Sequence, residues 1–351
     1  MTTTTDASLL EDIDLRPDAP PLLRVTGGAD AAAWAGRHRD AVRAAVGRHG
    51  ALLVRGLGLA DPAQATAVFT ALGSGLMTER EAFAARTAHD DGVYSSSAWP
   101  AAQPMCMHHE LSYARRPPGT MLFACLQAPT EGGATTIADA ADVLDALPAD
   151  LVDRAEATGW MLVRRYNEDI GATVGDAFGT DDPAQIDAYC RANDIESVWE
   201  ADGSLVTRQR RPAIVTHPVT GRRCWFNQVA FLSEWTLDPD VREFLLDCYG
   251  PQGLPFTTCF GDGEPIGPDV VALLADVYDA HTRREPWQSG DLLVVDNLAT
   301  AHAREPYSGP REVLVAMTDE MSRPGEAPRG ASGADESAPT PTGTTNETSG
   351  R

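Results

Sequence analysis

The sequence predicts a mainly β protein with helices, of the α+β class, built as a jelly roll with flanking helices and a helical insert. Short strand-like segments separated by turns occur at 105–138 and again at 291–318. Helical segments lie before, between and beside these two groups of strands. Short strands that are broken by turns and flanked by helices favour a double-sheet jelly roll. A chain of 351 residues can bury a large core, so we expect one domain over residues 21–321.

The N-terminal part predicts a layer of helices and one strand over residues 28–75. Residues 1–20 are polar and acidic, which predicts a flexible arm. An alanine-rich helical pattern over 30–49 ends at Gly50, and an apolar run at 51–56 predicts a buried strand. Asp61 and Pro62 predict the start of a second helix that ends at Leu72. The irregular stretch 78–104 is expected to be a mobile loop that covers the substrate.

The rest of the chain alternates strand-like and helical segments. Strands are predicted at 105–113, 121–126, 134–138, 160–165, 204–208, 213–216, 222–227, 291–296, 300–304 and 312–318. Helical segments are predicted at 139–157, 239–249 and 268–283, and in an insert over 166–200 whose clearest part is 183–193. Residues 322–351 are rich in Gly, Pro, Ser, Thr and Glu, which predicts a disordered tail.

Composition excludes several classes of function. A net charge of −23 argues against nucleic acid or an anionic membrane surface as a partner. The chain contains no lysine, which excludes a Schiff-base lysine and a P-loop. Six scattered cysteines without a C-x-x-C pair indicate free thiols in a reducing compartment. No signal peptide or membrane span is evident, so we expect a cytoplasmic protein whose oligomeric state stays open.

Three residues form a candidate metal site. His108 and Glu110 are two residues apart in a predicted strand, so both side chains should lie on one side while His109 points away. His302 follows a late apolar strand that ends in Asp-Asn, where a third ligand would be expected. Two imidazoles and one carboxylate suit Fe(II) and leave positions open for other ligands, although zinc would also accept them.

Four stretches, in this order and spacing, resemble one family. They are His-His-Glu-Leu-Ser-Tyr at 108–113, Pro-Thr-Glu-Gly-Gly-Ala-Thr at 129–135, Trp-Phe-Asn-Gln at 225–228, and 290–297 with His302 and Gly-Pro-Arg at 309–311. The chain resembles the TauD/TfdA superfamily of Fe(II)- and 2-oxoglutarate-dependent dioxygenases over roughly residues 50–320. It is most similar to the clavaminate-synthase-like and syringomycin-hydroxylase-like branch, whose fold is a double-stranded β-helix.

The resemblance implies the site and the chemistry. His108, Glu110 and His302 would ligate iron, and Thr135 and Arg311 would bind the distal carboxylate of 2-oxoglutarate. Arg304 is a weaker rival for that carboxylate, and a guanidinium fork suits it chemically. With O₂ and 2-oxoglutarate as co-substrates, the expected reaction is hydroxylation of an unactivated C–H bond. Related halogenases carry a small residue where this chain has Glu110, so halogenation is not expected.

The substrate is less defined by the sequence. An amino acid is expected, free or tethered to a peptidyl carrier protein, with Tyr113, Arg115, Asn227 and Gln228 as candidate contacts. The same chemistry could desaturate or cyclise such a substrate, because the outcome depends on substrate placement. Two further alternatives stay open: a cupin-like metal hydrolase or isomerase that does not use 2-oxoglutarate, and a binding module without activity.

Overall fold

A large mixed sheet forms the centre of the computed structural model, which describes residues 10–26, 30–84, 86–166, 171–250 and 253–322. Seven strands pair in the order β1-β2-β15-β6-β18-β4-β3. Their bounds are β1 Leu22–Arg24, β2 Ala51–Arg55, β3 Ala88–Asp90, β4 Val93–Ser95, β6 Pro118–Gln127, β15 Asp291–Asp296 and β18 Glu312–Glu320. The strands predicted at 51–56, 121–126, 291–296 and 312–318 are thereby confirmed.

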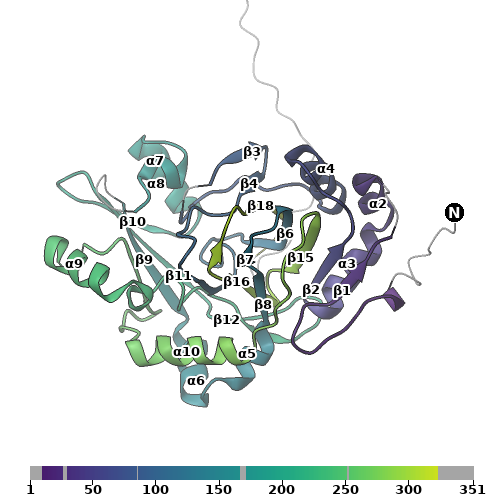
Figure 1. The fold of residues 1–351 in the computed structure, drawn as a ribbon. Helices are drawn as coiled ribbons and strands as arrows, with labels where there is room; N and C mark the ends of the chain where they lie inside the picture. Colours follow the sequence, from purple (N-terminus) through teal and green to yellow (C-terminus); the bar gives the residue numbers. More distant parts are fainter. Residues whose placement is uncertain (1–9, 27–29, 85, 167–170, 251–252, 323–351) are drawn as a thin grey trace, which may run out of the picture.

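Alternation along the strands divides the apolar core between the two faces of this sheet. In β6, Met121 and Phe123 pack into the core between the sheets, whereas Leu122 and Ala124 pack on the opposite face. Successive side chains of a strand point to opposite faces, so a strand that is buried on both faces has a continuous run of apolar residues in its sequence. Helices α2 Ala31–Arg37, α3 Arg39–His49 and α4 Pro62–Leu72 cover the outer face (Figure 1).

Smaller sheets lie across the inner face of the large sheet. Strands β5 Met105–His108, β16 Thr300–Arg304 and β8 Thr135–Asp139 form a three-stranded sheet. Strands β10 Glu196–Trp199, β11 Leu205–Arg211, β9 Trp160–Tyr166 and β14 Phe256–Phe260 form a four-stranded sheet. Two-stranded pairs join β12 Ile214–Thr216 to β13 Arg223–Trp225 and β17 Tyr307–Ser308 to β7 Glu131–Gly132. The core between the sheets draws on the large sheet and on both of the larger inner sheets.

Helices close the open sides of the inner sheets. They are α5 Ala140–Ala146, α6 Ala149–Thr158, α7 Val174–Phe178, α8 Pro183–Ala192, α9 Pro239–Tyr249 and α10 Pro268–Ala280, with a short 3₁₀ helix at Glu234–Thr236. Figure 1 shows α5, α6 and α10 together at one end of the molecule and α7 and α8 beside β10. The predicted capping of α4 is present, because the Asp61 side chain accepts the Gln64 N–H and Pro62 opens the helix.

Several predicted elements differ from the structure. The helix predicted over 30–49 is two helices, since buried His38 ends α2 with a non-helical backbone before α3 begins. Gly50 ends α3 in the left-handed conformation as predicted. The loop predicted at 78–104 contains the short hairpin β3–β4. The insert is not wholly helical, because β10 pairs with β11, and β14 was not predicted.

The described part of the predicted N-terminal arm contacts the domain. Asp14 and Leu22 exchange backbone hydrogen bonds, and the Asp18 carbonyl accepts the Arg284 N–H. Arg16 pairs with Glu285 at 2.9 Å. Residues 14–18 are therefore held in place, unlike the flexible arm that composition predicts. Residues 1–9 and all but the first residue of the predicted tail lie outside the described residues.

All six cysteines are free. None of the helices in the described ranges combines the length and the apolar character needed to cross a bilayer.

Candidate metal centre

Strand pairing brings the three predicted ligands together inside the jelly roll. His302 on β16 lies directly opposite His108 at the end of β5. The Nε2 atoms of His108 and His302 lie 3.8 and 3.7 Å from the same oxygen, Oε2 of Glu110. All three side chains are buried, and their ligand atoms lie within 4.8 Å of one another. The three residues predicted from sequence therefore form one cluster.

The protonation of this cluster suits a divalent cation. His108 Nδ1 lies 2.8 Å from the Cys106 carbonyl, which can only accept, so Nδ1 carries the proton and Nε2 keeps its lone pair. Burial, with His108 nearby, lowers the pKa of His302 to about 4, so this imidazole is neutral. Burial opposes ionisation of Glu110, but the positive charge of Arg86 outweighs it and holds the pKa of Glu110 well below the usual value. Two imidazoles and one carboxylate are the ligand set that fits Fe(II).

Glu110 reaches the centre by a turn and not along a strand. β5 ends at His108, and Leu111 has a positive φ of 50°. The Asn297 side chain accepts the Glu110 N–H at 2.8 Å and donates to the Glu110 carbonyl at 2.9 Å, satisfying the backbone where sheet pairing stops. The predicted strand over 105–113 is wrong beyond His108 for this reason. His109 points away as predicted, with its Nδ1 2.6 Å from the Asn297 carbonyl.

Two cavities meet at the ligand cluster. The first, here called the arginine cavity, contains Thr135, Arg304 and Arg311 beside the three ligands. The second, here called the aromatic cavity, contains Phe83 and Phe231 beside His108 and Glu110. Arg86, Ser97, Met105, His108 and Glu110 line both cavities. The two cavities enclose about 40 and 20 Å³, and a group bound in either one would contact the metal centre.

Arg311 packs against a turn that requires glycine. Gly133 has a φ of +67°, and a Cβ there would lie 3.2 Å from Arg311 Cδ and 2.9 Å from Tyr307 Cβ. The Gly133 carbonyl accepts a hydrogen bond from Arg311 Nε at 3.1 Å, and Ser96 Oγ lies 3.3 Å from Nη1. Burial, together with Arg304, lowers the pKa of Arg311 to about 10. Within the described chain, no carboxylate forms an ion pair with this buried cation.

Arg304, the rival to Arg311, is occupied by the backbone of the preceding loop. Its Nη2 donates to the carbonyls of Pro100 and Gln103 at 2.7 and 2.8 Å, and its Nη1 to that of Trp99 at 3.2 Å. Arg304 and Thr135 are also opposite each other in the β16–β8 register. The Arg304 guanidinium therefore holds residues 99–103 beside the cavity. Arg311 lines the same cavity, and within the described residues its guanidinium forms no ion pair with a carboxylate.

Arg86 and Glu79 are residues of the centre that sequence reasoning missed. Arg86 Nη2 donates to both carboxylate oxygens of Glu110, at 3.2 Å to Oε1 and 3.3 Å to Oε2, and Nε donates to Ser97. Arg86 Nη1 lies 3.4 Å from Glu79 Oε1. Burial acts to lower the pKa of Arg86, but Glu110 and Glu79 raise it overall. Both residues come from the irregular segment 78–104, where no spacing pattern marks them, although its position before the ligand motif indicated a covering role.

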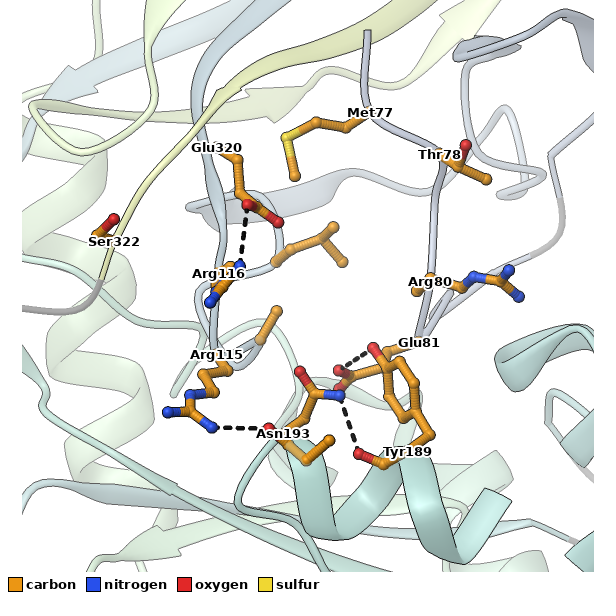
Figure 2. Close-up of a pocket in the computed structure, with 13 residues that line it drawn as sticks. Met77, Thr78, Arg80, Glu81, Arg115, Arg116, Tyr189, Asn193, Glu320 and Ser322 are labelled. Atoms are coloured by element: carbon orange, nitrogen blue, oxygen red, sulfur yellow. Dashed lines mark hydrogen bonds and ion pairs between the residues drawn. The ribbon is translucent and has the colours of Figure 1, made fainter. Parts of the chain in front are cut away.

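The four predicted substrate contacts lie in three different places. Tyr113 and Gln228 line the aromatic cavity. Asn227 is buried behind it and bonds the backbone of Ala213 and Val229. Arg115 lies in a different pocket of about 720 Å³ with Arg116 and Tyr189, where it donates to the Ala192 carbonyl (Figure 2). That pocket includes none of the three ligands, so the structure does not bring Arg115 to the metal centre.

Comparison with known proteins gives the family. Residues 16–318 match the model of the family described as taurine catabolism dioxygenase TauD, TfdA. The dapdiamide synthesis protein DdaC of Enterobacter agglomerans is 33% identical over 270 residues, 77% of this chain and 82% of its own length. A clavaminate synthase-like protein of Arabidopsis thaliana is 29% identical over 279 residues, 76% of this chain and 81% of that protein.

Solved structures confirm the fold. PvcB of Pseudomonas aeruginosa has a TM-score of 0.51 and 16% identity, covering 88% of this chain and 90% of PvcB. A taurine dioxygenase of Burkholderia xenovorans has a TM-score of 0.50 and 18% identity, covering 88% and 89%. These likenesses confirm the predicted double-stranded β-helix with helices. The family match and the buried two-histidine, one-carboxylate cluster lead to one conclusion: the chain is an enzyme of the TauD/TfdA family of Fe(II)- and 2-oxoglutarate-dependent dioxygenases.

Proposed function

We propose that this enzyme hydroxylates an unactivated C–H bond of an amino acid, free or tethered to a carrier protein, in the synthesis of a natural product. One observation carries the proposal: the ligand cluster lies between a cavity with an acid-free buried arginine and a second cavity with aromatic walls. The arginine of the first cavity offers a cation to a dicarboxylate co-substrate, and the aromatic side chains of the second offer an apolar contact to a separate organic substrate. The dapdiamide synthesis protein DdaC, by its name, acts in the synthesis of such a product.

His108, Glu110 and His302 would hold Fe(II), which supplies activation of O₂ and cleavage of a strong C–H bond when it is bound. Asn297 fixes the backbone of Glu110, and the Cys106 carbonyl fixes the tautomer of His108. Arg86 Nη2 holds the Glu110 carboxylate through both of its oxygens, and Oε2 is the oxygen that faces the two histidines. The chain therefore orients three donors on one side and leaves the other side accessible to ligands.

Arg311 and Thr135 would bind the distal carboxylate of 2-oxoglutarate. A buried guanidinium is costly unless an anion compensates its charge, and none of the described residues supplies one by ion pairing. A carboxylate can accept two charge-assisted hydrogen bonds from the fork and a third from the Thr135 hydroxyl. Thr135 lines the same cavity as Arg311 and is buried.

The test is a visible spectrum of the protein under nitrogen, titrated with Fe(II) with and without 2-oxoglutarate. A weak charge-transfer band that requires both would support bidentate chelation of 2-oxoglutarate at this centre. Metal binding without a band would favour a hydrolase or isomerase that uses the same ligands. Absence of metal binding would favour a protein without activity. With a substrate in hand, product mass separates hydroxylation, which adds oxygen, from desaturation or cyclisation, which remove a pair of hydrogens.

A further inference from the structure

Two buried polar atoms in the aromatic cavity lack hydrogen-bond partners. Arg86 Nη1 and Gln228 Oε1 are both buried, and neither makes a hydrogen bond within the described part of the chain. The rest of each side chain is fixed, since Arg86 bonds Glu110 and Ser97 and Gln228 Nε2 donates to the His109 carbonyl at 2.7 Å. Buried polar groups are normally satisfied, so a donor and an acceptor directed into one cavity point to a ligand that supplies their complements.

Glu79 adds a negative charge beside these two atoms. Its carboxylate lies 3.4 Å from Arg86 Nη1, which is an ion pair without a hydrogen bond. Burial raises the pKa of Glu79, with Arg86 opposing, so this carboxylate lacks the partners that fully stabilise its charge. Arg86 and Glu79 are both about nine-tenths buried, at 8% and 10% exposure of their side chains. Arg86 and Glu79 are therefore close enough to offset each other's charge, but no hydrogen bond joins them.

We propose that Arg86, Glu79 and Gln228 recognise the zwitterionic group of a free α-amino acid. The proposal rests on the function proposed above and deepens it. The substrate carboxylate binds the Nη1 side of Arg86, and its ammonium group binds Glu79 and Gln228 Oε1. A zwitterion brings one charge of each sign, so it matches the Arg86–Glu79 pair without leaving a net charge buried. It also supplies an acceptor for Nη1 and a donor for Oε1.

This assignment selects the free amino acid over one held as a thioester on a carrier protein. A thioester has no carboxylate, so it would leave the Arg86 donor unsatisfied in a buried cavity. Aromatic rings enclose the space beside these polar groups, with the Phe231 ring stacked on His108 at 4.5 Å and Phe83 5.1 Å from Phe231. These rings can contact the carbon skeleton of the substrate while Arg86 and Glu79 fix its polar end.

The experiment measures binding and not turnover. The protein is loaded with Fe(II) and 2-oxoglutarate under nitrogen, and free L-amino acids, their methyl esters and their desamino acids are titrated against the charge-transfer band. At least one free amino acid should shift the band, and its ester and desamino analogue should bind about tenfold more weakly or worse, as expected for losing a charged hydrogen bond. The variants are Arg86→Gln, Glu79→Gln and a surface control, Arg208→Gln, which removes only a pair with Glu196.

Arg86→Gln should bind the amino acid and its methyl ester equally, and Glu79→Gln should bind the amino acid and its desamino acid equally. Arg208→Gln should keep both differences. The proposal is overturned if the wild type binds esters as tightly as free acids, if no free amino acid shifts the band, or if Arg86→Gln weakens acid and ester by the same factor. Absence of the band in the wild type would instead overturn the proposed function, and this assignment with it.

Discussion

Asn297 holds Glu110 by both polar groups of its backbone. The Asn297 side chain accepts the Glu110 N–H at 2.8 Å and donates to the Glu110 carbonyl at 2.9 Å, and it donates also to the Pro118 carbonyl at 2.8 Å. Asn297 immediately follows β15, and the chain then returns as β16 with His302. One fully buried amide therefore links the loop that carries the carboxylate to the hairpin that carries the third ligand.

Asn297→Ala should weaken metal binding without removing a ligand. The substitution leaves the Glu110 N–H and carbonyl unsatisfied, at about 1–3 kcal/mol for each buried group, and frees the carboxylate to move. Groups that orient metal ligands typically contribute roughly 10–100-fold to affinity. Calorimetric titration with Mn(II) measures this. Asn193→Ala, which removes a bond to the Tyr189 carbonyl beside the separate pocket, is the matched control. Equal Mn(II) affinity in Asn297→Ala and wild type would contradict the role given to Asn297.

Each metal ligand should be required for stabilisation by metal. A bound ion stabilises the folded state by mass action, by about 2.7 kcal/mol when its concentration is 100 times Kd. Mn(II) should therefore raise the melting temperature of the wild type but not of His108→Ala, Glu110→Ala or His302→Ala. His89→Ala, at an exposed position on β3, should keep the full shift. A metal-dependent shift that survives Glu110→Ala would show that the ion binds elsewhere.

The metal ligands could be predicted from the sequence because metal binding needs particular residue types at particular spacings. The residues that support the ligands are brought to them by tertiary packing, which no spacing pattern marks. His108, Glu110 and His302 stand in a recognisable pattern, and β5 and β16 bring two of them opposite each other. Arg86 reaches Glu110 from an irregular segment, so no periodicity marks it. The strand prediction extended past His108 because a pattern of alternating residues does not reveal that Asn297 satisfies the backbone of Glu110 in place of a neighbouring strand.

The single helix predicted over 30–49 also shows that a sequence pattern cannot reveal the effect of tertiary packing. The alanine-rich stretch over 30–49 has a continuous helical pattern, and nothing in its residue types predicts the break. The backbone turns at His38, whose φ of −108° ends α2 with its N–H bonded to the Trp34 carbonyl. The Trp34 and His38 rings then contact each other at 5.2 Å, and both residues are buried. The break between α2 and α3 is therefore set by tertiary packing, and the helix propensities of the residues do not predict it.

Arg311→Ala should weaken binding of 2-oxoglutarate, and Arg304→Ala should do so less. Hydrogen bonds to charged groups contribute about 1.5–3 kcal/mol each, so loss of the Arg311 fork should raise Kd for 2-oxoglutarate at least tenfold. Arg311→Lys keeps the charge but not the fork and should be intermediate. Arg304 bonds three loop carbonyls, so its loss should lower thermal stability instead. Titration of the charge-transfer band gives both affinities. A larger loss in Arg304→Ala would assign the carboxylate to Arg304.

Arg55→Ala should destabilise the fold strongly. Arg55 on β2 makes a two-pronged contact with buried Asp291 on β15 through Nη2 at 2.8 Å and Nε at 3.1 Å, and Nη1 pairs with Glu285 at 2.8 Å. Removing one partner leaves a buried carboxylate uncompensated, which costs roughly 3–5 kcal/mol. Arg208→Ala removes an exposed pair and should cost under about 1 kcal/mol. Urea unfolding compares them, and similar midpoints for both variants would show that Asp291 finds another partner.

Asp319→Asn should give a stability loss that depends on pH. Burial opposes ionisation of Asp319, but hydrogen bonds from Ser74, Arg43 and Thr120 outweigh it and lower its pKa. A group whose folded pKa is depressed contributes stability above its unfolded value and loses that contribution as pH falls through the folded pKa. The variant should therefore be less stable than wild type at neutral pH, with the gap closing as pH falls below about 4.

The substitution isolates the charge because asparagine tolerates the backbone at this position. Asp319 has a φ of 60°, in the left-handed region where Asn and Asp are the most frequent residues other than glycine. Glu320→Gln is the control, since Glu320 pairs with Arg116 at 3.5 Å at the surface and should matter little at any pH. Urea unfolding at several pH values measures both. A gap between Asp319→Asn and wild type that stays constant down to low pH would mean that shape, and not ionisation, sets the contribution of Asp319.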